Sequence, residues 1–113
     1  MKFQTSQEGN VTQLQVGVEK LDSKVAPDLK SQFILLANDE SSGHLIVDLS
    51  HVAFADSSGL SALLLAHRLY RETERKLIFH SVTDRIMKLI EISQLTPVFS
   101  IATNAEEANS LVV

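Results

Sequence analysis

A short polar turn, Asp56-Ser57-Ser58-Gly59, holds the side chains of this chain that are best suited to chemistry. The turn stands where a branched apolar stretch gives way to a helical pattern, which is the position of a helix N-cap. Carboxylate and hydroxyl oxygens there accept hydrogen bonds from the free N–H groups of the first helical turn. The helix end also stabilises an anion, so this turn would tolerate a phosphate. Because ordinary helix starts prefer the same residue types, spacing alone leaves both a capping role and a functional role open.

The sequence lacks the phosphate-cradling loops of nucleotide-hydrolysing enzymes. Such loops need several closely spaced glycines and often a lysine. The glycines here are far apart: Gly9, Gly17, Gly43 and Gly59. Val47-Asp48 resembles the Mg²⁺-binding half of an NTPase site, but without a glycine-rich loop we expect a solvated carboxylate at the end of a strand.

The histidines do not indicate a metal site or a hydrolase. Their spacing matches no metal-binding motif; they are His44, His51, His67 and His80. Ser57 could in principle join a Ser-His-Asp triad, but the sequence has no Gly-x-Ser-x-Gly elbow and no candidate oxyanion loop. We therefore expect no enzymatic activity, no metal and no cofactor.

Length and composition indicate one globular domain over residues 1–113, with 44% hydrophobic residues. The formal charge of −4 and the absence of basic segments interleaved with aromatics argue against direct contact with nucleic acid. The chain has no cysteine, which excludes disulfides and thiolate chemistry. Its longest apolar runs, such as Ala62–Ala66, are far too short for a membrane span, and its first residues do not begin a signal peptide. We expect a soluble, cytoplasmic protein without a membrane partner.

The first third of the chain predicts a hairpin and a helix. Lys2–Gln7 and Val11–Val18 are strand-like, and Glu8-Gly9-Asn10 between them predicts the hairpin turn. The apolar spacing that follows predicts a helix over 26–38, with Pro27 near its start.

The centre of the chain predicts a buried strand over His44–Leu49, the polar turn and then a long helix. After Gly59 the apolar residues recur at three- and four-residue steps, so one stripe should face the core while charged residues face water. The expected stripe comprises Leu60, Leu63, Leu64 and His67, continued by Tyr70 or Arg71. The expected solvent-facing residues are Arg68, Glu72 and Arg75.

The last third predicts a strand over Lys76–Val82, a helix capped by Thr83 that ends at Thr96-Pro97, and a short strand over Val98–Ala102. Thr103-Asn104-Ala105-Glu106 has the spacing of a capping box and predicts a terminal helix. The expected apolar face of that helix comprises Ala108, Leu111 and Val112.

These elements predict an α/β fold with a mixed sheet of about five strands. Strands and helices alternate from residue 25 onward, which is typical of a largely parallel sheet with helices packed against it, and the N-terminal hairpin adds an antiparallel edge. Binding sites in such sheets lie outside the carboxyl ends of the strands. The Asp56–Gly59 turn lies at one of those ends.

With these elements placed, the chain resembles the anti-sigma-factor antagonists, the bacterial STAS domains. The resemblance is carried by Asp56-Ser57-Ser58-Gly59-Leu60, followed by Leu63-Leu64-Leu65. Leu45–Phe54 is similar to the family's strand and approach loop, and Ile86–Leu95 is similar to its third helix. The resemblance covers nearly the whole chain and implies a single STAS-like domain.

The resemblance implies a phosphorylation switch. In this family the first serine after the aspartate, here Ser57, is phosphorylated by a partner that is both a kinase and an anti-sigma factor, and a serine phosphatase reverses the reaction. The unphosphorylated form binds that partner and frees sigma factor, and phosphorylation breaks the complex. Asp56, Ser58 and Gly59 would shape the turn and its docking surface.

Two positions depart from the family pattern. Of the family's early Gly-x-Leu-Asp element, Leu21-Asp22 matches but Glu19 replaces the glycine, so Asp22 joins the implied site on a partial match. Ser61 stands where many members have a second glycine. Arg85 and Lys88, with Asp84, are further candidates for the contact surface near the third helix.

Two alternatives of a different class remain open. The same fold could use the turn as a pocket for a nucleotide or another small ligand, as some STAS domains have been suggested to do. The chain could also be a structural subunit of a signalling or transport assembly, in which Ser57 only caps a helix.

Overall fold

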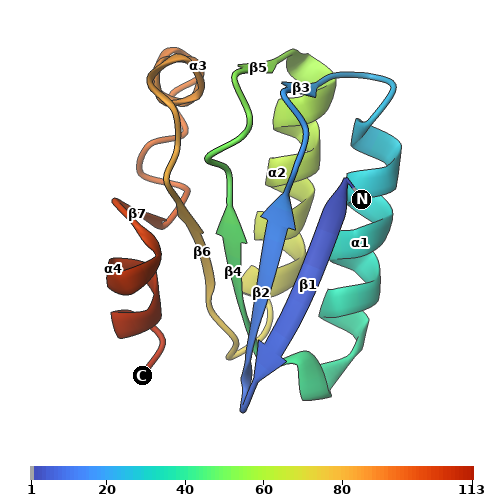
Figure 1. Cartoon of the computed structure of the whole chain (residues 1–113), viewed down its shortest axis with the longest axis vertical. Helices are drawn as coiled ribbons and strands as arrows, with labels where there is room; N and C mark the ends of the chain where they lie inside the picture. The colour runs from blue at the N-terminus through green and yellow to red at the C-terminus, as the bar shows by residue number, and fades with distance from the viewer. Residues whose placement is uncertain (1) are drawn as a thin grey trace.

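A five-stranded mixed sheet forms the centre of the computed structural model, which describes residues 2–113 (Figure 1). β1 and β2 form the predicted antiparallel hairpin, and the remaining neighbours are parallel. In spatial order the strands are β1 (Phe3–Glu8), β2 (Val11–Val16), β4 (His44–Asp48), β6 (Leu77–His80) and β7 (Ile101–Ala102). The predicted α/β fold is confirmed.

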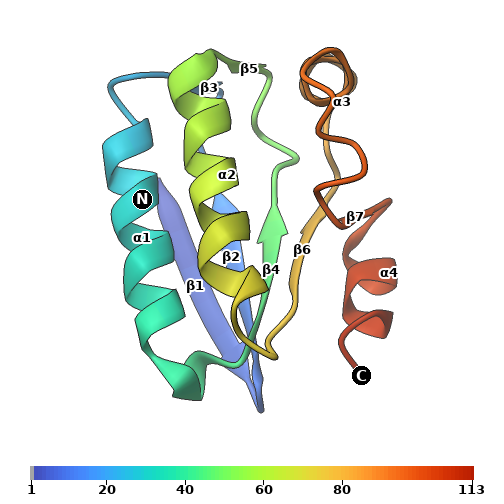
Figure 2. The same ribbon diagram turned by 180° about the vertical axis from the view of Figure 1, so that it is seen from behind.

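Helices cover the two faces of the sheet differently. α1 (Ala26–Asn38) and α2 (Ser57–Arg71) lie side by side on one face (Figure 2). On the other face, α4 (Ala105–Ser110) packs against β4, β6 and β7. α3 (Asp84–Ile92) lies across one end of the sheet (Figure 1). None of the helices in the described part of the chain is long and apolar enough to span a membrane.

The strand residues alternate between these two layers, as a sheet with two packed faces requires. Val47 and Phe79 point into the core below α1 and α2, whereas Ile46 and Ile78 belong to a smaller cluster below α4. The larger core also buries Leu29 and Phe33 of α1; its fully buried strand residues include Leu14, Val16 and Leu45.

Two short strands were not predicted from the sequence. β3 (Lys20–Leu21) and β5 (Phe54–Ala55) pair in parallel at the end of the molecule that carries α3. A strand of two residues has no alternation that a sequence pattern could reveal. This small sheet joins the segment before α1 to the segment before α2.

Several predicted boundaries need correction, although the bounds of α1 are confirmed. β2 ends at Val16, two residues early. α3 ends at Ile92, well before Thr96-Pro97, because Gln94 turns left-handed with φ 61°. The N–H of Leu95 then donates to the carbonyl of Ile90 at 2.9 Å, which closes the helix end.

The buried face of α2 is rotated relative to the predicted stripe. Leu63 and Tyr70 of that stripe are buried, but Leu60, Leu64 and His67 are only half-buried. Small residues dominate the buried face and let α2 approach its neighbours closely. The fully buried residues are Gly59, Ala62, Leu63, Ala66 and Tyr70.

Arg75 does not face water as predicted. Its guanidinium donates to carbonyls of Leu36 and Asp39 at 3.3 and 3.2 Å, and also to the carbonyl of Ala37. It also lies over the ring of Tyr70, 5.1 Å from the centroid. Arg75 therefore satisfies carbonyls that the C-terminal end of α1 leaves free.

The terminal helix begins one residue later than the predicted capping box. Asn104, not Thr103, is the N-cap, and its Oδ1 accepts from the N–H of Glu107 at 2.9 Å. The carboxylate of Glu107 in turn accepts from the N–H of Thr103 at 2.8 Å. Of the predicted apolar face, Ala108 and Val112 are buried but Leu111 is exposed.

Candidate functional site

The polar turn begins α2, and Asp56 caps this helix. Asp56 is the N-cap, with an extended backbone, and its Oδ1 accepts from the N–H of Gly59 at 3.0 Å. Ser57 is the first residue of the helix, and its side chain is exposed, whereas Ser58 is half-buried. The capping interpretation therefore accounts for Asp56 and leaves the hydroxyl of Ser57 without that role.

The small sheet fixes the turn against the segment that precedes α1. The N–H of Asp56 donates to the carbonyl of Leu21 at 3.3 Å. A Cβ on Gly59 would lie 2.2 Å from that same carbonyl oxygen, which is far inside van der Waals contact. Only a glycine allows the two segments to come this close.

Asp22 follows directly after this contact, so the structure brings its segment beside the Asp56 turn. Its Oδ1 accepts from the N–H of Lys24 at 3.0 Å, and its carbonyl accepts from the N–H groups of Val25 and Ala26. The carboxylate of Asp22 therefore organises the entry to α1, and none of the hydrogen bonds within residues 2–113 joins it to Asp56 or Ser57.

An apolar groove of about 420 Å³ lies between β5 and α3, beside the turn. Two large apolar side chains on it reach solvent: Phe54 is 40% exposed and Ile92 is 78% exposed. Sequence patterns did not assign these residues to a site, although Phe54 directly precedes the polar turn. The groove is lined by Phe54, Ala55, Arg85, Ile86, Lys88, Leu89 and Ile92.

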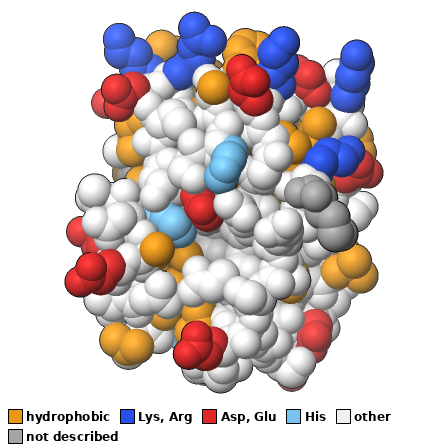
Figure 3. Space-filling model, in the orientation of Figure 1, with side chains coloured by type: hydrophobic (Ala, Val, Ile, Leu, Met, Phe, Trp, Pro, Cys, Tyr) orange, Lys and Arg blue, Asp and Glu red, His pale blue; other side chains and the backbone are white. Residues whose placement is uncertain are grey.

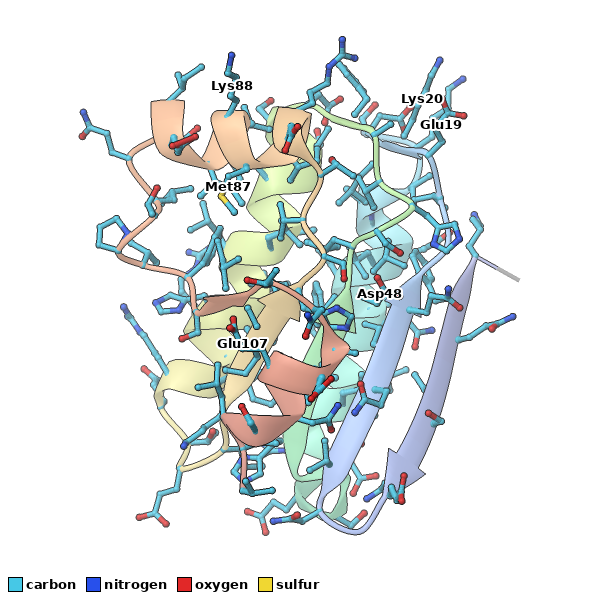
Figure 4. The ribbon with its side chains drawn as sticks, turned by 60° about the vertical axis from the view of Figure 1, so that its left-hand side comes forward. Glu19, Lys20, Asp48, Met87, Lys88 and Glu107 are labelled. Atoms are coloured by element: carbon cyan, nitrogen blue, oxygen red, sulfur yellow. The ribbon has the colours of Figure 1, made fainter. Side chains whose placement is uncertain are left out.

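Basic side chains are numerous at this end of the molecule despite the negative net charge of the chain. Lys and Arg side chains gather along the end that carries α3 and the small sheet (Figure 3). Lys88 of α3 and Lys20 of β3 both point away from the body there, although Glu19 also lies there beside Lys20 (Figure 4). Arg85 and Lys24 are also exposed at this end. The groove therefore combines exposed apolar surface with a cationic rim, as a protein-binding surface does.

The four histidines are dispersed through the structure. His51 contacts the hydroxyl of Ser50, His44 accepts from the N–H of Lys76, and His67 packs edge-on against Phe99. Within residues 2–113 no histidine hydrogen-bonds to Ser57, and no group of acidic or histidine side chains could hold a metal ion. The carboxylate of Asp48 accepts from the N–H of Ser50, in the turn that directly follows β4.

We predict a pH dependence of stability that comes from His80. This side chain is buried at the end of β6, and burial lowers its pKa below the usual 6.5, while the neighbouring carboxylate of Asp48 opposes the shift. The unfolded chain therefore binds more protons below pH 6.5, so the free energy of unfolding should fall as the pH drops through and below that value.

Urea unfolding between pH 7.5 and pH 5 would measure this effect (about the range in which histidine titrates). The decline should be steeper for the natural chain than for His80→Gln, which cannot titrate. His51→Gln, at an exposed histidine, should keep the natural slope. Equal slopes for the natural chain and His80→Gln would contradict the prediction.

Comparison with known proteins finds similarity over nearly the whole chain. The family model described as "STAS domain" matches residues 2–108. The anti-sigma-B factor antagonist of Listeria monocytogenes is 28% identical over 90 residues, which are 80% of this chain and 78% of that protein.

Solved structures have the same fold. An anti-sigma-factor antagonist (STAS) domain protein from Planctomyces limnophilus superimposes with a TM-score of 0.87 at 17% identity, over 97% of each chain. The Bacillus cell fate determinant SpoIIAA in its phosphorylated form superimposes with a TM-score of 0.74 at 18% identity, over 96% of this chain and 98% of that one. At these identities the structures support the fold alone.

Proposed function

Because this chain belongs to the STAS domain family, we propose that it is an anti-sigma factor antagonist whose binding is controlled by phosphorylation of Ser57. A relative in Listeria monocytogenes is named an anti-sigma-B factor antagonist. In this proposal the chain acts by binding a protein partner and not by catalysis. The partner is an anti-sigma factor with serine kinase activity, and a serine phosphatase restores the unmodified form.

The observation that carries the proposal is the division of roles at the start of α2. Asp56 caps the helix, so the exposed hydroxyl of Ser57 is available for modification. A phosphate on Ser57 would lie at the N-terminus of a fifteen-residue helix, where the helix dipole stabilises negative charge. The modified chain should therefore remain folded.

The docking surface in this proposal consists of the turn and the adjacent groove. Phe54 and Ile92 supply exposed apolar area, and Arg85 and Lys88 supply positive charge to meet an acidic region of the partner. Asp56, Ser58 and Gly59 keep Ser57 at the edge of this surface, and the segment of Asp22 supports the turn from the other side. The unmodified chain would occupy the anti-sigma factor and so release sigma factor.

Phosphorylation would end this complex through charge. The phosphate adds about 1.5 to 2 negative charges beside Asp56. In a docked interface these charges meet a partner surface that was complementary to the cationic rim, and they must also lose their hydration. Like charges brought together at an interface cost several kcal/mol. The proposed switch thus needs no change of fold.

Intact-mass spectrometry tests the proposal. The natural chain and Ser57→Ala are incubated with ATP and cytosol from the source organism, and fragmentation then locates any phosphate. We expect one phosphate on the natural chain, at Ser57, and none on Ser57→Ala. Fragmentation separates Ser57 from Ser58 and Ser61, which lie close by in sequence.

An unmodified natural chain, in a lysate whose kinases phosphorylate a control substrate, would contradict the proposal. Saturable binding of a nucleotide in calorimetry, lost in Ser57→Arg, would then favour a ligand-binding module. Normal output from a strain that carries Ser57→Ala would favour a structural subunit.

A further inference from the structure

β1 is an open edge of the central sheet. It is the first strand in the order β1-β2-β4-β6-β7, so its other side has no neighbour within the described chain. The opposite edge, β7, has only two residues, which is one way in which proteins protect an edge from further pairing. β1 has six residues, and Figure 1 shows it running along the margin of the sheet.

The hydrogen-bond pattern of the hairpin determines which backbone groups of β1 face outward. The N–H of Gly17 donates to the carbonyl of Lys2 at 2.6 Å, so this opposed pair is a hydrogen-bonded one. Hydrogen-bonded pairs alternate along an antiparallel ladder. In this register the residues bonded to β2 are therefore Lys2, Gln4, Ser6 and Glu8. The N–H and C=O groups of Phe3, Thr5 and Gln7 point away from β2.

We propose that a second copy of this chain pairs with β1, antiparallel and centred on Thr5, to form a two-fold symmetric dimer. In this register Thr5 opposes Thr5 of the second copy and Phe3 opposes Gln7. All three outward-facing residues then exchange hydrogen bonds. The contact is the same from both sides, as a two-fold interface requires.

The charges at the two ends of β1 select this register. Lys2 opposes Glu8 of the second copy, and the symmetry repeats this pair at the other end. A centre at Gln4 places Lys2 opposite Ser6 and moves Glu8 out of the paired segment, and a centre at Ser6 places Glu8 opposite Gln4. Parallel pairing in register places like charges side by side. Between Lys2 and Glu8 the strand has no charged residue and no proline, the usual features that block pairing at an edge.

The flank of α1 beside β1 supplies an exposed apolar residue for the same contact. Lys2 bonds to Asp28 at 3.2 Å, which places that face of α1 beside the open edge. Leu35 follows seven residues later on the same face of the helix and is 66% exposed. Gln7, near the far end of β1, donates to the carbonyl of Ser41, so Leu35 lies level with the middle of β1.

Residues of the second copy would contact this flank. Phe3 packs toward the α1 side of the sheet. Because side chains alternate along a strand, Thr5 and Gln7 point to the same side as Phe3. In an added strand the same three residues point toward α1 and cover Leu35. The proposed dimer interface thus combines backbone hydrogen bonds along β1, charge pairs at the ends of β1 and the apolar side chain of Leu35.

Sedimentation equilibrium of the full chain tests the dimer over concentrations from about 1 μM to about 1 mM. We expect the mass to rise with concentration toward twice the 12.5 kDa of one chain. Thr5→Pro should weaken dimerisation at least about tenfold, because symmetry removes two N–H donors from the new ladder. That N–H points away from β2, so the hairpin keeps its hydrogen bonds, and Thr5→Val is the control that keeps the donor.

Leu35→Glu gives a second test that leaves β1 unchanged. It should also weaken dimerisation at least about tenfold, because the contact would have to bury a charge. Ile34→Glu, at an exposed residue about 100° around the helix, should have little effect. The end charges test the register: Glu8→Lys, which places two lysines opposite each other, should weaken the dimer more than Glu8→Gln does, and both variants leave the Lys2–Asp28 ion pair intact.

A natural chain that stays at 12.5 kDa throughout the range would overturn the inference. So would a dimer that neither Thr5→Pro nor Leu35→Glu weakens while both variants keep the natural circular-dichroism spectrum. The inference does not depend on the proposed function, because neither Ser57 nor the groove beside α3 belongs to this edge.

Discussion

We expect a Ser57→Glu chain to bind its kinase partner at least about a hundredfold more weakly than the unmodified chain. Like charges at an interface cost several kcal/mol, and each ~1.4 kcal/mol corresponds to a factor of ten in affinity. The substituted carboxylate would lie at the first residue of α2, next to Asp56 and two residues after Ala55, which lines the groove. Calorimetry with the partner recovered from the phosphorylation experiment measures the change.

Ser57→Gln is the matched control, because glutamine has the size of glutamate without its charge. We expect this variant to bind within about fivefold of the natural chain, since an exposed position tolerates a larger neutral side chain. If both variants bind poorly, bulk and not charge is the cause. If Ser57→Glu binds as tightly as the natural chain, the proposed mechanism is wrong.

We expect Gly59→Ala to destabilise the fold by about 3 kcal/mol. The new methyl group would lie 2.2 Å from the carbonyl oxygen of Leu21, so β3 and the start of α2 would have to separate. Helix propensity predicts the opposite sign, because alanine is favoured over glycine within a helix by about 1 kcal/mol. The sign of the change in the free energy of unfolding, measured in urea, therefore decides between contact and propensity.

Ser61→Ala provides the comparison within the same helix. This residue is half-buried, and the substitution removes an oxygen without adding volume, so a change of about 0.5 kcal/mol or less is expected. Gly59→Ala should also weaken partner binding, because it moves the segment of Asp22 away from the Asp56 turn. A Gly59→Ala chain as stable as the natural one would show that the close approach of the two segments is dispensable.

Sequence patterns predicted the features that depend on neighbours along the chain. The hairpin turn, the bounds of α1 and a helix N-cap within Asp56–Ser58 follow from local residue types, and the structure confirms them. The family resemblance identified Ser57 as the phosphoacceptor. The phosphorylation of Ser57 remains a prediction.

Features that depend on distant contacts could not be predicted. The pairing of β3 with β5 joins segments more than thirty residues apart, and neither has a pattern of its own. The face of α2 was misjudged because Ala62 and Ala66, which periodicity counts as weakly apolar, are fully buried on it. Arg75 was expected at the surface because arginine is usually exposed. The carbonyls that it binds lie at the C-terminal end of α1, about 36 to 39 residues away in the sequence.

Asp56 caps α2 and Ser57 is the proposed phosphoacceptor, and this separation of roles has a consequence for the speed of signalling. Since the residue that holds the helix start is not the residue proposed to receive the phosphate, addition or removal of that group requires no backbone rearrangement. Local unfolding and refolding would add a delay to each cycle, and this arrangement avoids it. The response time would then depend on the turnover of the kinase and phosphatase and on the lifetime of the protein complex.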